Sequence, residues 1–159
     1  MYKQILDYVE SKIDDFNRPK ILPAFFNQSF CYFDKLGTIV VPGKSSFFKV
    51  VYDFNGWRRF ILNYLKDEFD LHLQCRDYFV FAFLHEVGHH VNLNNLDDSS
   101  HIRKHTRLEY RKLPNEYAAD KFAVDFIKAF PDVLNMSNDL ITDDYLVTLE
   151  DYYNKVINS

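Results

Sequence analysis

Apolar side chains recur at intervals of three and four residues in two stretches of the chain, 2–16 and 57–70. This spacing predicts amphipathic helices, because residues three and four apart lie on one face of a helix. Apolar residues fill much of a third stretch, 77–93, which predicts a helix that is buried along much of its length.

Residues that begin or end helices indicate two more. Pro114 is typical of the first turn of a helix, because the N–H group that proline lacks has no helical partner there. The helix is expected over about 114–130, where Pro131 ends it. Thr142, which two aspartates follow, is typical of the capped start of a last helix over 143–157.

Strands are predicted in the first third of the chain. Residues 29–33 and 38–41 are β-branched or aromatic and flank Asp34–Gly37, which suits a hairpin turn. Residues 46–54 are a candidate third strand, and the prolines that follow the first helix predict only an extended stretch. The pattern therefore predicts an α+β fold with a small, three-stranded sheet and helices packed on it.

A long loop is expected over 94–113, where polar residues follow one another without periodicity. Its second half is basic between Arg103 and Lys112 but also holds Glu109, so we interpret it as solvated surface. The net charge of −4, with histidines neutral, gives no general attraction to nucleic acid. We therefore expect no nucleic-acid partner.

The length and composition are those of a single globular domain. The 159 residues suit one domain, 1–159, with a hydrophobic core. The longest apolar run, 78–84, is too short to cross a bilayer, and residues 1–10 lack the basic and apolar regions of a signal peptide. We therefore expect no membrane association and a cytoplasmic location.

The segment 85–89, HEVGH, places two histidines on the buried third helix. Because His85 and His89 are four residues apart, they share one face, about 6 Å apart along the axis, and can converge on one ion. Zinc suits imidazole, and catalytic zinc sites keep one position open. Glu86 can stand beside that position, take a proton from metal-bound water and pass it to a leaving amine. The motif predicts Zn²⁺ as cofactor and Glu86 as general base.

A third ligand is needed. The candidates are imidazole and carboxylate residues that follow the motif: His101, His105, Glu109 and Glu116. Glu116 is preferred because it lies on the next predicted helix, where the small Ala118 and Ala119 permit close approach to the histidines. Asp120 lies one turn further on the same face and can accept a hydrogen bond from the outer nitrogen of a ligating histidine.

The other histidines have different expected roles. His90 points about a quarter-turn away from His89, so a hydrogen-bonded structural role is expected for it. His72 is expected at the surface or at the edge of the core. Three residues of the long loop could stabilise an oxyanion or contact substrate: His101, His105 and Tyr110.

The two motifs together resemble the gluzincin metallopeptidases, in which HExxH is followed by ExxxD. Residues 81–90, FAFLHEVGHH, are similar to the HExGHH helix of the ImmA/IrrE family. Residues 116–123, EYAADKFA, resemble that family's ExxANxFA segment, with Asp120 in place of the usual Asn. They also resemble the ExxAD of the HtpX and CAAX-prenyl-protease group, whose members are membrane proteins, so the ImmA/IrrE-like interpretation is preferred.

This resemblance, which covers residues 79–123, implies a compact zincin-like fold. It also implies roles for five residues: zinc ligation by His85, His89 and Glu116, general base catalysis by Glu86, and orientation of a ligand by Asp120.

The predicted function is hydrolysis of peptide bonds in a protein or peptide by a zinc-activated water. Two alternatives stay open. One is a non-catalytic zincin-fold regulator that binds a protein partner and whose zinc is structural or whose active site is blocked. A metal site closed by a fourth protein ligand would favour this alternative. The other is a peptidase in which His101 or His105 replaces Glu116 as the third ligand.

Overall fold

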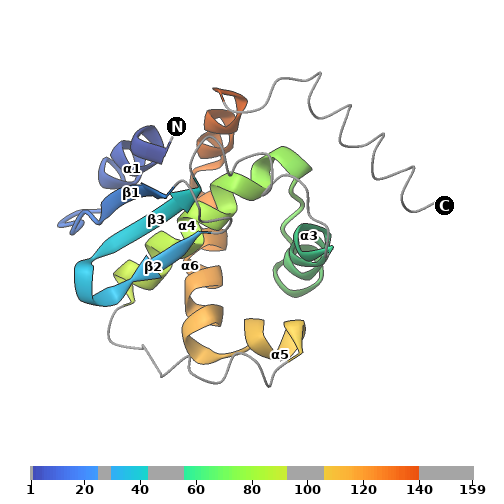
Figure 1. Cartoon of the computed structure of the whole chain (residues 1–159). Helices are drawn as coiled ribbons and strands as arrows, with labels where there is room; N and C mark the ends of the chain where they lie inside the picture. Colours follow the sequence, from blue (N-terminus) through green and yellow to red (C-terminus); the bar gives the residue numbers. More distant parts are fainter. Residues whose placement is uncertain (1, 25–29, 43–55, 93–105, 140–159) are drawn as a thin grey trace.

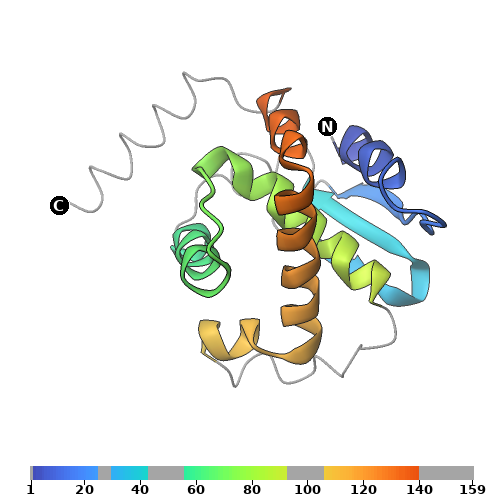
Figure 2. The same ribbon diagram turned by 180° about the vertical axis from the view of Figure 1, so that it is seen from behind.

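A computed structural model describes four segments of the chain: 2–24, 30–42, 56–92 and 106–139. They form an α+β structure with a three-stranded sheet, which confirms the predicted fold class. Helix α4 (Tyr78–Val91) lies between the sheet and helix α6 (Pro114–Ala129), as the front and rear views agree (Figure 1; Figure 2). This central helix carries the HEVGH motif.

The sheet has the strand order β1-β3-β2. The central strand β3 (Thr38–Pro42) pairs in parallel with β1 (Lys20–Ala24) and antiparallel with β2 (Cys31–Phe33). Strands β2 and β3 form the predicted hairpin, whose turn holds the short helix η1 (Asp34–Leu36). Gly37 completes the turn at a φ of 54°, a conformation that costs glycine little because it has no Cβ.

The third strand of the described sheet is β1, for which the sequence predicted only an extended stretch. Pro23 explains the difference, because proline cannot donate to a strand ladder and usually argues against a strand. Here it is tolerated because β1 is at the edge of the sheet, where Pro23 pairs with Val41 of β3. The predicted strand over 46–54 lies outside the described residues.

The first helix, α1 (Tyr2–Glu10), is shorter than the predicted 2–16. The chain turns after it, and Asp15 adopts a left-handed φ of 56°. Ile13 and Phe16, which extended the apolar stripe in the sequence, still pack against the core. Their spacing therefore reflects burial of a turn and not continuation of the helix.

Three predicted helices are confirmed to within two residues at each end: α3 (Trp57–Phe69), α4 and α6. Short 3₁₀ helices that the sequence did not predict precede α4 and follow α6, namely η2 (Cys75–Asp77) and η5 (Pro131–Asp139). No helix in the described part of the chain is long and apolar enough to cross a membrane. The helix predicted over 143–157 lies outside that part.

The predicted loop over 94–113 contains a helix, α5 (Arg107–Arg111), so this prediction was wrong for its last part. The Thr106 hydroxyl accepts a hydrogen bond from the Glu109 N–H (3.3 Å), and the Glu109 carboxylate accepts one from the Thr106 N–H (2.7 Å). This capping box is visible in the sequence as Thr-x-x-Glu, a signal that predicts a helix start. Residues 94–105 lie outside the described residues.

Helix α4 crosses α6 at very short range where Gly88 meets Ala119. A Cβ atom placed on Gly88 would lie 2.8 Å from the Ala119 Cα atom and 2.8 Å from its carbonyl oxygen. Both neighbours are backbone atoms and cannot move aside as a flexible side chain can. The absence of a side chain at Gly88 therefore sets how closely the two helices approach, and the predicted closeness at Ala119 is confirmed.

Replacing Gly88 with Ala should lower the free energy of unfolding of the metal-free protein by roughly 1–3 kcal/mol, because the added methyl group overpacks the crossing. The sign of this change distinguishes overpacking from helix propensity, since Gly→Ala inside a helix ordinarily raises the free energy of unfolding by about 1 kcal/mol. Urea denaturation in the presence of a chelator measures the change. Val91→Ala, at an exposed position of the same helix, is the control, and a Gly88→Ala protein as stable as the wild type would contradict the packing argument.

Candidate metal centre

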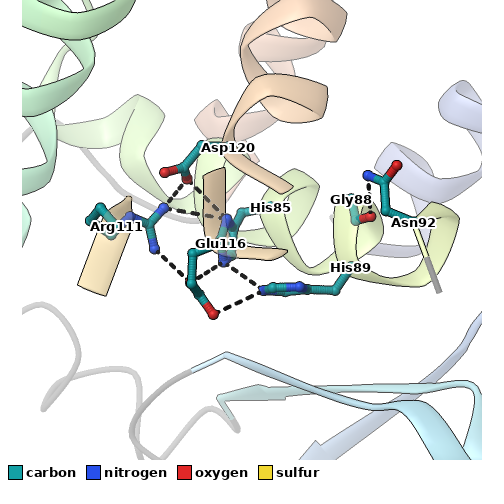
Figure 3. Close-up of polar contacts among 7 residues, drawn as sticks. All are labelled: His85, Gly88, His89, Asn92, Arg111, Glu116 and Asp120. Carbon is teal, nitrogen blue, oxygen red and sulfur yellow. Dashed lines mark hydrogen bonds and ion pairs between the residues drawn. The ribbon is translucent and has the colours of Figure 1, made fainter. Parts of the chain in front are cut away.

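The crossing of α4 and α6 brings together His85, His89 and Glu116, the three residues predicted to bind metal. Their ligand atoms all lie within 4.8 Å of one another. The Nε2 atoms of the two histidines are 3.0 Å apart. The Glu116 oxygens lie 3.4 Å from the His85 Nε2 and 3.5 Å from the His89 Nε2. Figure 3 shows the two imidazoles and the carboxylate pointing toward one another.

These separations fit the coordination shell of a metal ion. With metal–ligand bonds of about 2.0–2.1 Å, two ligands of a tetrahedral ion lie about 3.3 Å apart. The three measured distances, 3.0, 3.4 and 3.5 Å, lie close to this value. The group formed by His85, His89 and Glu116 could therefore hold a metal ion.

Asp120 lies one turn beyond Glu116 on α6 and is completely buried. Its Oδ1 atom is 3.0 Å from the His85 Nδ1. Because an ionised carboxylate can only accept, the His85 Nδ1 donates this hydrogen bond, and the Nε2 of a neutral imidazole then carries the lone pair that a metal needs. The contact is the one that the sequence predicted for Asp120.

Arg111, the last residue of α5, is a member of the site that the sequence analysis missed. It belonged to the basic stretch that was interpreted as solvated surface, yet it is only 5% exposed. Its guanidinium contacts two carboxylates of α6, with Nη1 3.3 Å from the Glu116 Oε2 and Nη2 hydrogen-bonded to the Asp120 Oδ1. The capping box of α5 was the available signal, since a short helix here directs some basic side chains inward.

The charges around the site keep two ligands in the forms that bind metal. Burial lowers the pKa of His89 to about 4, so its imidazole is neutral at pH 7. Burial acts to raise the pKa of Glu116, but its contacts with His85 and the positive charge of Arg111 outweigh this and lower that pKa to about 2. A metal ion at neutral pH would displace no proton from either residue.

Glu86 lies on α4 next to His85 and is 8% exposed. Burial raises the pKa of its carboxyl group. The backbone of Tyr32, in strand β2, donates a hydrogen bond to this carboxylate. Glu86 is therefore a desolvated acid that can hold or release a proton closer to neutral pH than an ordinary glutamate.

His90 has the hydrogen-bonded structural role that the sequence predicted. Its Nε2 lies 2.5 Å from the Asn17 carbonyl oxygen, which can only accept, so Nε2 carries the proton. In the neutral ring, Nδ1 then accepts from the Tyr32 hydroxyl at 2.8 Å. Tyr32 thus contacts both Glu86 and His90, one turn apart on α4, and fixes strand β2 against the helix.

The remaining predicted residues have mixed outcomes. The Tyr110 hydroxyl donates a hydrogen bond to Glu116, and burial together with this carboxylate raises the pKa of Tyr110. The structure thus places Tyr110 against a candidate ligand, and its role toward an oxyanion stays a prediction. His72 is at the surface, as expected, with its side chain 67% exposed. His101 and His105 lie outside the described residues.

No family model matches the chain, and no curated protein and no solved structure is significantly similar to it. The resemblance to the gluzincin metallopeptidases therefore stays a prediction from two short motifs. The functional interpretation depends on the geometry of the site.

Replacing Glu116 with Gln should lower the affinity for Zn²⁺ or Co²⁺ at least about a hundredfold, because the variant loses a charged ligand. The wild-type protein should retain about one metal ion per chain after dialysis. Competition with a chromophoric chelator measures the affinity, and elemental analysis measures the content. Asp125→Asn, which removes an exposed carboxylate from the same helix, is the control. Unchanged affinity in Glu116→Gln would move the third ligand to His101 or His105.

Proposed function

We propose that this protein is a zinc-dependent peptidase that hydrolyses peptide bonds in a protein or peptide substrate, with Glu86 as general base. The observation that supports the proposal most directly is the convergence of His85, His89 and Glu116 at a buried site next to Glu86. Two imidazoles and one carboxylate are a ligand set of catalytic zinc sites, in which a fourth position stays open for water or substrate.

The donor set favours zinc over the hard cations Ca²⁺ and Mg²⁺. Ca²⁺ and Mg²⁺ prefer shells made of oxygen ligands, whereas His85 and His89 supply nitrogen. Ligand separations of 3.0–3.5 Å suit the short bonds and tetrahedral geometry that zinc adopts. Zinc also undergoes no redox change, which suits a hydrolytic reaction.

The formal charge of the site also favours a divalent cation. Glu86, Glu116 and Asp120 supply three carboxylates, and Arg111 supplies one guanidinium, all of them less than a tenth exposed. When these groups are ionised, three negative charges and one positive charge leave a net charge of −2. Buried charge is costly unless it is compensated, and a divalent cation would bring this sum to zero.

The residues around the site suit hydrolysis. When bound, zinc would lower the pKa of a coordinated water and polarise the scissile carbonyl group. Glu86 would accept a proton from the attacking water on its carboxylate and donate it to the leaving amine nitrogen. The raised pKa of Glu86 supports both steps, because proton transfer is most efficient when the pKa of the catalytic group lies near the working pH. Asp120 would keep the His85 Nε2 directed at the metal.

Replacing Glu86 with Gln should lower peptide hydrolysis by about 100- to 10,000-fold while metal content stays at the wild-type level, because an amide cannot take up the proton. The rates are measured with zinc-loaded proteins on unfolded casein and on a library of fluorescence-quenched peptides. Asp125→Asn is prepared in parallel as the control for charge and purification.

Two outcomes would count against this function. Equal hydrolysis by wild type and Glu86→Gln would mean that a different residue, or a contaminant, cleaves the substrates. Zinc-loaded wild type that cleaves none of them would favour the non-catalytic role, in which the same fold binds a protein partner.

A further inference from the structure

The guanidinium of Arg111 is buried directly behind two carboxylates of the site. Figure 3 shows Glu116 between Arg111 on one side and His89 on the other. The Arg111 Nη1 lies 3.3 Å from the Glu116 Oε2, and the Nη2 is hydrogen-bonded to the Asp120 Oδ1. The two outer nitrogens of one planar guanidinium group thus contact the carboxylates of both Glu116 and Asp120.

His85 contacts the same oxygen of Asp120 as Arg111 does. Its Nδ1 lies 3.0 Å from the Asp120 Oδ1 and 3.3 Å from the Arg111 Nη2. Because both nitrogens carry protons, the Arg111–His85 approach is no hydrogen bond, and the two N–H groups converge on the same carboxylate oxygen. Asp120 therefore orients a candidate metal ligand while its own charge is paired with Arg111.

Helix α5 is built in a way that directs Arg111 inward. The capping box between Thr106 and Glu109 starts the helix. The Tyr110 ring packs near the Trp57 ring of α3, at a centroid distance of 6.4 Å, and its hydroxyl contacts Glu116. The next basic residue, Lys112, points outward with its side chain 53% exposed. Arg111 is thus buried, whereas its neighbour Lys112 is exposed to solvent.

We propose that Arg111 is the internal counter-ion of the metal-free site. It is a positioning residue that holds Glu116 and Asp120 in their places when no metal ion compensates their charge. This inference rests on the proposed metal site. Because Arg111 and a divalent cation compensate the same carboxylates, each reduces the need for the other. Loss of Arg111 should therefore destabilise the metal-free protein more than the metal-bound protein.

The test compares Arg111→Met, Arg111→Lys and the control Lys112→Met by thermal denaturation, first in chelator and then in a fixed excess of Zn²⁺. In chelator, Arg111→Met should lower the midpoint by roughly 10 °C, because two buried carboxylates lose the guanidinium that compensates their charge. Lys112→Met, which removes the same charge from the surface, should shift it by no more than about 2 °C. Arg111→Lys should give a midpoint between those of the other two variants. Lysine keeps the positive charge but lacks the two guanidinium nitrogens that contact Glu116 and Asp120 together.

Zinc should then raise the midpoint of Arg111→Met by more than it raises that of wild type, since the metal replaces the missing charge. If Arg111→Met does not fold in chelator, the double variant Arg111→Met with Glu116→Gln decides the matter. When Glu116 carries no charge, loss of Arg111 should lower the stability of the metal-free protein by a smaller amount, and the double variant should fold.

Two results would overturn the proposal. One is a metal-free Arg111→Met protein that is as stable as Lys112→Met or, where Arg111→Met does not fold, a double variant that also fails to fold. The other is a smaller zinc-induced rise in Arg111→Met than in wild type, which would mean that Arg111 assists metal binding. If zinc raises no midpoint at all, including that of wild type, the proposed peptidase site fails, while the comparison in chelator still decides whether Arg111 compensates the two carboxylates.

Discussion

The contact between Gly88 and Ala119 is the constraint on which the site depends. Helix α4 can approach the backbone of α6 because position 88 carries no side chain. The approach places His85 and His89 of one helix against Glu116 and Asp120 of the other, within hydrogen-bonding and metal-coordinating distance. A wider crossing would leave the same residues on facing helices but would separate their ligand atoms by more than one ion can bridge.

This crossing creates an electrostatic problem, because it buries carboxylates inside an otherwise apolar core. The phenylalanines of α4 are almost completely buried, and Asp120 has no exposed surface. In such surroundings an uncompensated charge is strongly destabilising. The structure pairs Glu116 and Asp120 with Arg111, and the arrangement of His85, His89 and Glu116 could add a metal ion. Both cations would act on the same carboxylates, so metal binding and the stability of the fold are expected to be linked.

The sheet contributes to the site through one strand. The Tyr32 backbone donates to Glu86, and the Tyr32 hydroxyl donates to His90 one turn further along α4. Glu86 is held at this buried position, and burial raises its pKa although the hydrogen bond from Tyr32 opposes the rise. His90, the last histidine of the HEVGHH segment, thus has a physical role without binding metal, since it fixes the strand that contacts the proposed general base.

The sequence by itself determined the elements that carry the chemistry. Periodicity and Pro114 located α3, α4 and α6 to within two residues, because local apolar spacing and proline geometry decide where helices lie. The four-residue spacing of His85 and His89 placed them on one face of α4. Glu116 and Asp120, which share a face of α6, were predicted to lie beside these histidines.

Only the tertiary structure decided what depends on contacts between distant segments. Strand β1 forms despite Pro23 because it pairs with β3 at an edge, and Ile13 and Phe16 reach the core from a turn and not from a helix. Arg111 has the same local sequence character as Lys112, yet one is buried against carboxylates and the other is exposed. Charge patterns along the chain cannot separate these two, because the difference arises from how α5 packs beside α6.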